Sequence, residues 1–157
     1  MGGNGSYSKQ WRGVPQASRT HIDTGFRIGG HKVLLYGSNT GHNKIIMNSN
    51  SRSPIYLFAS LDKKTGKVSV SGIGIYKNHA LSRSIDLKFD SDGHAKPFNR
   101  GEGGSHSHKW QEISPGVYGR KSHDKNNHLS IPKQYKALIR KIENFNKKGK
   151  QWKKGKD

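Results

Sequence analysis

Short apolar runs separated by polar turns fill the first two thirds of the chain. Residues 31–36 form one such run after Gly29 and Gly30, and this pattern predicts a strand that starts at a turn. A second run, 55–59, has the length of a buried strand. Residues 62–66 end in a glycine, as a hairpin turn with a left-handed position requires. The pattern therefore predicts neighbouring antiparallel strands.

The alternation of apolar and polar residues continues after this turn but slips by one position. Val68 and Val70 occupy one face of the predicted strand. Ile73 and Ile75 fit that face only if one residue is skipped near Gly72. Because the slip of a two-residue period falls at a glycine, it indicates a β-bulge in one long strand.

Three more strands are predicted further along the chain. Residues 84–89 alternate so that Asp86 points outward, and a turn over 90–93 follows them. Their inward side chains are Ile85, Leu87 and Phe89. Residues 106–113 and 117–120 predict a hairpin, since a Pro-Gly pair lies between them. Together these segments predict an antiparallel meander.

An amphipathic helix is expected near the C-terminus. Ser130 is placed to cap its start, and Pro132 is tolerated in its first turn. The apolar residues that follow recur at helical spacing and would lie across the sheet: Tyr135, Leu138, Ile139, Ile142 and Phe145. A shorter helix is expected at 42–48.

The predicted fold class is therefore α+β, with an antiparallel sheet of four to six strands and a C-terminal helix. We expect a flexible basic arm at 1–20, a single domain at 21–146 and a basic tail rich in Lys, Gly and Trp at 147–157. Only 29% of the residues are hydrophobic and 20 are glycine, which predicts a thin core.

Composition excludes several classes of protein. The chain has no cysteine, which rules out disulfides and thiolate metal sites. Its first residues lack the apolar core of a signal peptide, and its longest apolar run, 55–59, is too short to cross a bilayer. We expect a cytoplasmic protein, of the host or of a target cell, that does not associate with membranes.

The charge balance points to a polyanionic partner. Lys and Arg number 29 against 10 Asp and Glu, so the formal net charge is +19. Such an excess opposes a compact fold by self-repulsion, whereas each contact with a phosphate releases counterions and favours binding. We therefore expect RNA or a nucleoprotein complex as the partner, and a neutralising or target protein as a possible second one.

Two histidine-containing segments are the candidates for chemistry. In the segment 103–110, His106 and His108 lie on one face if the backbone is extended. The segment 119–128 carries further histidines and cations, and Asp124 is placed to orient an imidazole. A hairpin between the two segments would bring together the candidate catalytic residues His106, His108, His123, His128, Arg120 and Lys121.

Histidines and cations suit cleavage of RNA without a metal. One imidazole takes the proton of a 2′-hydroxyl, another protonates the leaving oxygen, and Lys or Arg stabilises the phosphoryl charge. The competing chemistry is a zinc-like site formed by the His-x-His pair with His123, Asp124 or His128. We expect no metal or other cofactor, because the chain has no cysteine and these segments lack the glutamate that acts as base beside catalytic zinc.

Basic residues interleaved with aromatic ones are expected to contact nucleic acid. Cations hold phosphates, and an exposed ring stacks on a base. The residues of this kind are Trp11, Arg12, Lys109, Lys147, Lys148, Lys150, Trp152, Lys153 and Lys154.

A small basic α+β domain with scattered His, Lys and Arg and no cysteine resembles the ribonuclease toxins of the barnase, EndoU, colicin and RelE type, across roughly residues 20–146. The opening Met-Gly-Gly-Asn-Gly-Ser is similar to that of proteins of Gram-positive prophages. The resemblance implies a metal-independent endoribonuclease toxin carried by phages or mobile elements. Two alternatives remain: a phage protein that inhibits a nucleoprotein effector without catalysis, as anti-CRISPR proteins do, and a ribosome-associated structural protein.

Overall fold

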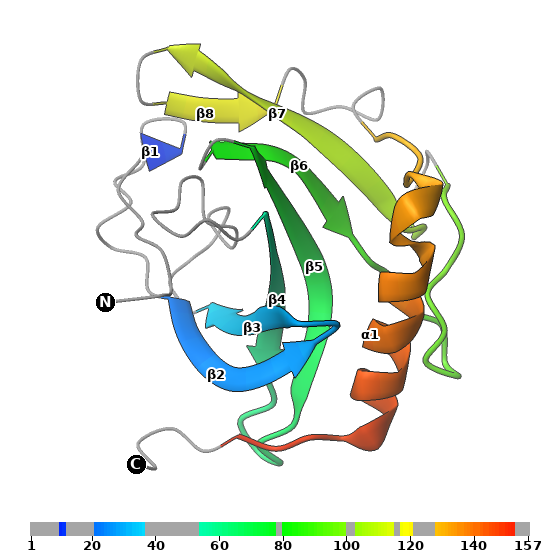
Figure 1. Ribbon diagram of the computed structural model, residues 1–157. Coiled ribbons are helices and arrows are strands. Elements are labelled where there is room, and N and C mark those ends of the chain that lie inside the picture. The colour runs from blue at the N-terminus through cyan, green and yellow to red at the C-terminus, as the bar shows by residue number, and fades with distance from the viewer. Residues whose placement is uncertain are drawn as a thin grey trace.

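A curved β-sheet with one helix across it forms the molecule in the computed structural model (Figure 1). The structure describes residues 10–11, 21–36, 54–77, 80–99, 103–114, 117–120 and 128–152. The strands within these ranges are β1 (Gln10–Trp11), β2 (His21–Ile28), β3 (His31–Tyr36), β4 (Ile55–Leu61), β5 (Val68–Lys77), β6 (Ala80–Asp86), β7 (His106–Ser114) and β8 (Val117–Arg120). A 3-10 turn, η3 (Lys133–Tyr135), leads into helix α1 (Lys136–Lys148).

The α+β class is confirmed, and the sheet is larger than expected. Its strand order is β1-β8-β7-β6-β5-β4-β3-β2, in which β2–β7 form six successive strands. The meander from β4 to β8 is antiparallel, as predicted. However, β3 runs parallel to β4, so these two strands are not hairpin partners. Strand β2 was missed by the sequence analysis.

The bulge expected near Gly72 is confirmed in β5. Phe58 of β4 faces Gly72, whereas the next residue, Ala59, faces Val70, so the residue between them has no opposite partner. The turn before β5 is also confirmed, because Gly66 has a φ of +79° and its N–H donates to the carbonyl of Asp62. Both features were visible as glycines at breaks in the pattern.

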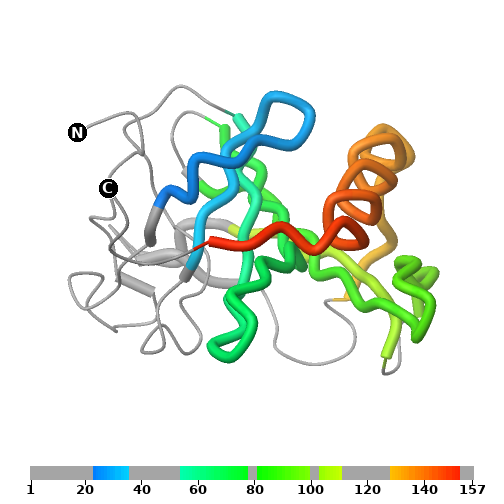
Figure 2. The backbone as a smooth tube through the Cα atoms, turned by 90° about the horizontal axis from the view of Figure 1, so that it is seen from below, coloured from blue at the N-terminus to red at the C-terminus, as the bar shows by residue number. Residues whose placement is uncertain are grey.

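Helix α1 lies against one face of the sheet, and a view from below shows the same arrangement (Figure 2). Ile142 and Phe145 are buried among the core residues of the strands, while the other members of the predicted stripe are partly buried there. The helix begins later than expected. Ser130 does not cap it, because residues 130–132 are not helical and the Ser130 carbonyl accepts a hydrogen bond from the Ser107 hydroxyl.

The ordered domain continues past the boundary expected at residue 146. Lys147 and Lys148 complete α1, which ends at Gly149 in a left-handed conformation. The carbonyl of Lys150 then accepts a hydrogen bond from Val68, and the N–H of Trp152 donates to Gly66. Trp152 is partly buried against the core. Residues 147–152 therefore belong to the packed domain.

The sheet buries side chains on both faces. In β4, Leu57 and Ala59 pack with α1 in one core cluster. Tyr56 and Phe58, which alternate with them, are buried on the opposite face. No helix in the described part of the chain is long and apolar enough to cross a membrane. The expected helix at 42–48 and nearly all of the 1–20 arm lie outside the described residues.

Candidate histidine–carboxylate site

Strands β6 and β7 carry one aspartate and two histidines on the sheet face away from α1. The antiparallel register places Asp86 opposite His106 and Ser84 opposite His108. Because side chains alternate along a strand, these four residues share one face, while Ile85 points into the core beside α1. Pairing of β6 with β7 thus adds the carboxylate of Asp86 to the two predicted histidines.

One oxygen of Asp86 contacts both histidines. Its Oδ2 atom lies 3.3 Å from Nε2 of His106 and 3.3 Å from Nε2 of His108. The His108 side chain is only 2% exposed and that of His106 10%, whereas Asp86 is 39% exposed. Solvent or a substrate therefore reaches the cluster from the Asp86 side.

The second ring nitrogen of His106 is also engaged. Its Nδ1 atom is 3.0 Å from the carbonyl oxygen of Gly104. A carbonyl only accepts, so this Nδ1 carries a hydrogen and the ring orientation is fixed. Gly104 is closely packed, because a side chain there would meet the Pro97 carbonyl at 2.8 Å. Nε2 is left to face Asp86.

A third histidine comes from the segment between β8 and α1. Ser107 and Leu129 exchange two backbone hydrogen bonds of 2.7 and 2.9 Å, which fix His128 beside β7. The His128 ring stacks on His106 with centroids 4.0 Å apart and planes 5° apart. The His108 ring stands edge-on to both others. His106, His108 and His128 are therefore one cluster.

The carboxylate and the histidines shift each other's proton affinity. Burial by itself would raise the pKa of Asp86, but hydrogen bonds from His106 and His108, together with their positive charge, hold that pKa well below its ordinary value. The hydrogen bond to Asp86 raises the pKa of His106 above that of a free imidazole, although burial opposes this. Asp86 is thus an anion, and His106 favours the protonated form.

The structure brings together three of the six residues predicted to be catalytic: His106, His108 and His128. Arg120 lies on β8 with its backbone paired to Trp110, but its side chain is outside the described part of the chain. Lys121, His123 and Asp124 also lie outside it. The expected hairpin between the two segments is confirmed for β7 and β8.

The predicted nucleic-acid-binding residues do not form one surface within the described part of the chain. Lys109 is exposed on β7, and Lys147, Lys148 and Lys150 are exposed at the far end of α1. Trp152 is partly buried in the core, and only the backbone of Trp11 is described, in β1. Arg12, Lys153 and Lys154 lie outside the described residues.

Sequence analysis missed Asp86 as a member of the site. It recognised that this side chain points away from the core but did not connect it to the histidines. The signal that finds it is register: a slip of one residue between β6 and β7 would place Asp86 on the face opposite to His106. A single sequence does not specify that register.

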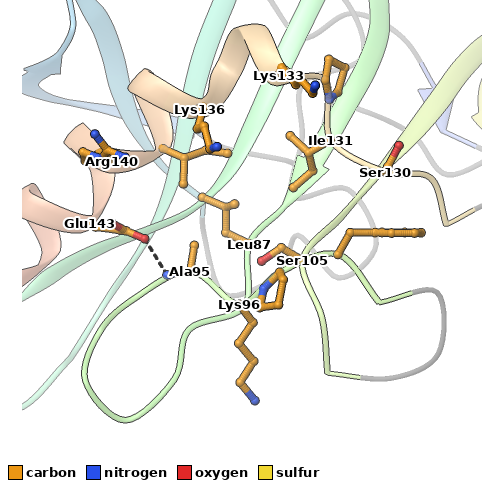
Figure 3. A pocket seen from close by; sticks show the side chains of 14 residues that line it. Leu87, Ala95, Lys96, Ser105, Ser130, Ile131, Lys133, Lys136, Arg140 and Glu143 are labelled. Carbon is orange, nitrogen blue, oxygen red and sulfur yellow. Dashed lines mark hydrogen bonds between the residues drawn. The ribbon is translucent and has the colours of Figure 1, made fainter.

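A cationic cleft lies on the other side of the same strand ends, between α1 and the loop after β6 (Figure 3). Leu87 and Ile131 form part of its apolar floor, and its basic side chains are Lys96, Lys133, Lys136 and Arg140. The acidic residue that lines it, Glu143, accepts a 2.7 Å hydrogen bond from the backbone of Ala95. The cleft therefore has an apolar floor and a positive rim.

Two groups of side chains among the described residues have the donor atoms of a metal site. In the first, one nitrogen each of His106, His108 and His128 lie within 4.8 Å of one another. The second comprises Asp90, Asp92 and His94 and is exposed on a turn. In that turn Oδ1 of Asp90 already accepts two backbone hydrogen bonds. Only the first group is buried.

No protein-family model, curated protein or solved structure matches this chain. The resemblance to ribonuclease toxins therefore stays a prediction.

Proposed function

We propose that the protein binds RNA and cleaves its backbone at the cluster of Asp86, His106, His108 and His128. The observation that supports this is the convergence of two imidazole Nε2 atoms on one oxygen of a partly exposed carboxylate. Cleavage of a phosphodiester beside a 2′-hydroxyl requires a proton acceptor, a proton donor and a positive charge near the phosphoryl oxygens. Imidazoles meet the first two needs at neutral pH.

The net charge of +19 supports RNA as the substrate. Phosphates attract Lys and Arg regardless of sequence, and this attraction concentrates the substrate near the protein. The cationic cleft adds a local contact near the cluster. Ser105 in its wall directly precedes His106 in the chain, and Ser130 in its wall lies two residues after His128. An RNA strand held in the cleft would pass the strand ends that carry the cluster.

The second candidate function is binding of a nucleic acid or nucleoprotein without cleavage. The low exposure of His108 favours it, since a buried imidazole is harder for a substrate to reach. Charge alone supports both functions. They differ in whether the RNA backbone is broken.

The test is incubation of the purified protein with labelled single-stranded RNA and DNA of the same sequence. We expect RNA to be cut and DNA to stay intact, because the reaction uses the 2′-hydroxyl. Asp86→Asn should slow cleavage at least about a hundredfold, since it removes the charge that holds the histidines, while RNA binding persists. His94→Ala, an exposed histidine outside the cluster, should cleave as the wild type does.

Two outcomes would contradict the proposal. RNA that is bound tightly but stays intact both with and without EDTA would make the protein a binder. Equal cleavage by Asp86→Asn and the wild type would place the active centre elsewhere.

A further inference from the structure

We propose that Asp86, His106 and His108 bind one divalent transition-metal ion such as Zn²⁺, with His128 as a fourth ligand. A role of this ion in a reaction rests on the RNA cleavage proposed above, whereas binding of the ion is independent of that proposal. Imidazole nitrogen and carboxylate oxygen are the ligands that such ions take in hydrolytic enzymes. The metal-free reaction expected from the sequence is the opposing view.

The distances from the carboxylate oxygen to the two imidazole nitrogens fit a tetrahedral ion. Zinc binds nitrogen and oxygen at about 2.0–2.2 Å, so two such ligands at tetrahedral angles stand about 3.4 Å apart. Oδ2 of Asp86 is 3.3 Å from each Nε2 atom of His106 and His108. The two rings stand at 84° to each other, so they do not block one another's approach to a shared point.

The hydrogen bond of His106 to Gly104 is the kind that accompanies metal ligation. Histidine ligands almost always donate their second ring N–H to a carbonyl or carboxylate, which fixes the tautomer. Here Nδ1 of His106 donates to the Gly104 carbonyl at 3.0 Å. This leaves the Nε2 lone pair on the side of Asp86, where an ion would replace the proton that Nε2 otherwise shares with the carboxylate.

His128 would complete the ligand set after a rotation of its ring. Its plane is within 5° of that of His106, and two parallel stacked rings cannot both point a nitrogen at one ion. One nitrogen of each of the three histidines lies within 4.8 Å of the others, and His128 would have to turn about its Cβ–Cγ bond to point a nitrogen at the ion. Until then this position is open to water or substrate, as in catalytic zinc sites.

An ion at this place would serve the proposed cleavage. It would stabilise charge on the phosphoryl oxygens and lower the pKa of a bound water. With the Nε2 atoms of His106 and His108 bound to the ion, this water would replace the imidazoles as the group that exchanges protons with the substrate. Because Asp86 is the most exposed of the ligands, the reaction would take place on its side of the cluster.

Metal binding is tested without RNA on untagged protein treated with EDTA and dialysed. Co²⁺ is titrated while visible absorption is recorded, and thermal unfolding is measured with and without Zn²⁺. We expect one Co²⁺ per chain with an absorption band of tetrahedral coordination, and a rise of Tm with Zn²⁺. Asp86→Asn and His108→Gln should each weaken binding at least tenfold, since loss even of an outer partner of a ligand costs about that much.

The control is His94→Ala in the exposed Asp90, Asp92 and His94 group, which should bind like the wild type. Circular dichroism of each metal-free variant shows whether it is folded. Should His108→Gln fail to fold, Asp86→Asn carries the comparison because its side chain is more exposed. Absence of both the Co²⁺ band and the Zn²⁺ shift in the wild type would overturn the inference, as would unaltered binding by Asp86→Asn.

The two proposals fail separately. A protein that binds Co²⁺ through the cluster but leaves RNA intact supports the metal site and contradicts RNA cleavage. A protein that cleaves RNA after EDTA treatment and binds no Co²⁺ supports RNA cleavage and overturns the metal site.

Discussion

Gly74 in β5 is a residue at which the fold leaves no room for a side chain. A methyl group there would lie 2.8 Å from Cε2 of Phe58 and 3.0 Å from Cε1 of Tyr76. Both rings are buried and cannot move aside without disturbing the core. We therefore expect Gly74→Ala to lower the free energy of unfolding by about 1–3 kcal/mol, measured by urea denaturation.

Gly72, two residues earlier on the same face, provides the control. A methyl group there would be 3.5 Å from Cβ of Phe58, an ordinary contact. Gly72→Ala should change the free energy of unfolding by less than about 1 kcal/mol. The change can be an increase, because alanine has less conformational freedom than glycine in the unfolded chain. Equal losses in both variants would show that contact with the two rings does not set the cost.

At the scale of residues, the sequence predicts that histidines form the site, but it does not predict every residue that contacts them. His106 and His108 were found because a two-residue spacing on a strand puts both on one face. Asp86 and the Gly104 carbonyl were not found, because they join the histidines through strand register and loop packing. Those contacts depend on the folded backbone.

Helix α1 is tied to the sheet through a single amide side chain. Oδ1 of Asn146 accepts the N–H of Val70 at 2.9 Å, and its Nδ2 donates to the Val70 carbonyl at 3.0 Å. Pairing of β5 with β6 begins at Gly72, so the edge of β5 before it is open to the helix. Asn146→Ala would leave the N–H and the carbonyl of the buried Val70 without these hydrogen bonds. The free energy of unfolding should therefore fall by about 1–3 kcal/mol.

Asn144→Ala is the matched control, since Asn144 is exposed on the same helix. Its effect on the free energy of unfolding should stay within about 0.5 kcal/mol. A loss at Asn144 as large as at Asn146 would mean that the link to Val70 does not explain the change.

At the scale of elements, local patterns predict strands and turns well and their partners less well. The strands β3, β4, β5, β7 and β8 and the apolar stripe of α1 follow from periodicity and turn residues. The strand expected at 84–89 was misplaced, because β6 spans Ala80–Asp86 and Leu87 and Phe89 lie beyond its end. The parallel pairing of β3 with β4 does not, because it depends on the path of the chain between them. The helix start was misplaced because Ser130 has the side chain of a cap but its carbonyl pairs with Ser107 instead.

At the scale of the whole molecule, the histidine cluster and the cationic cleft meet at the ends of β6 and β7. Asp86 and the histidines lie on one face, and Leu87 begins the wall of the cationic cleft on the other. Figure 1 shows these strand ends beside the first turns of α1. A polyanion bound along the cleft would therefore be close to the cluster. Part of the excess positive charge is thus located where it could guide a polyanion to the histidines.

Reversal of charge in the cleft tests this arrangement. In Lys133→Glu with Lys136→Glu, each change removes two units, so the net charge falls from +19 to +15. We expect the affinity for single-stranded RNA to drop at least about tenfold at low salt, and the slope of log K against log salt to become shallower by about 1.4, since about 0.7 is lost per phosphate contact. Fluorescence anisotropy at several salt concentrations measures both.

Lys63→Glu with Lys64→Glu separates position from total charge. This variant has the same net charge, and both lysines are exposed in the turn between β4 and β5. That turn contacts residues 150–152 beyond the C-terminal end of α1, about 20 Å along the helix from Lys133 and Lys136. If affinity depends on the cleft, this variant keeps nearly the wild-type slope. If both variants lose the same affinity and slope, RNA is attracted by total charge alone, and the cleft has no special part in guiding it to the histidines.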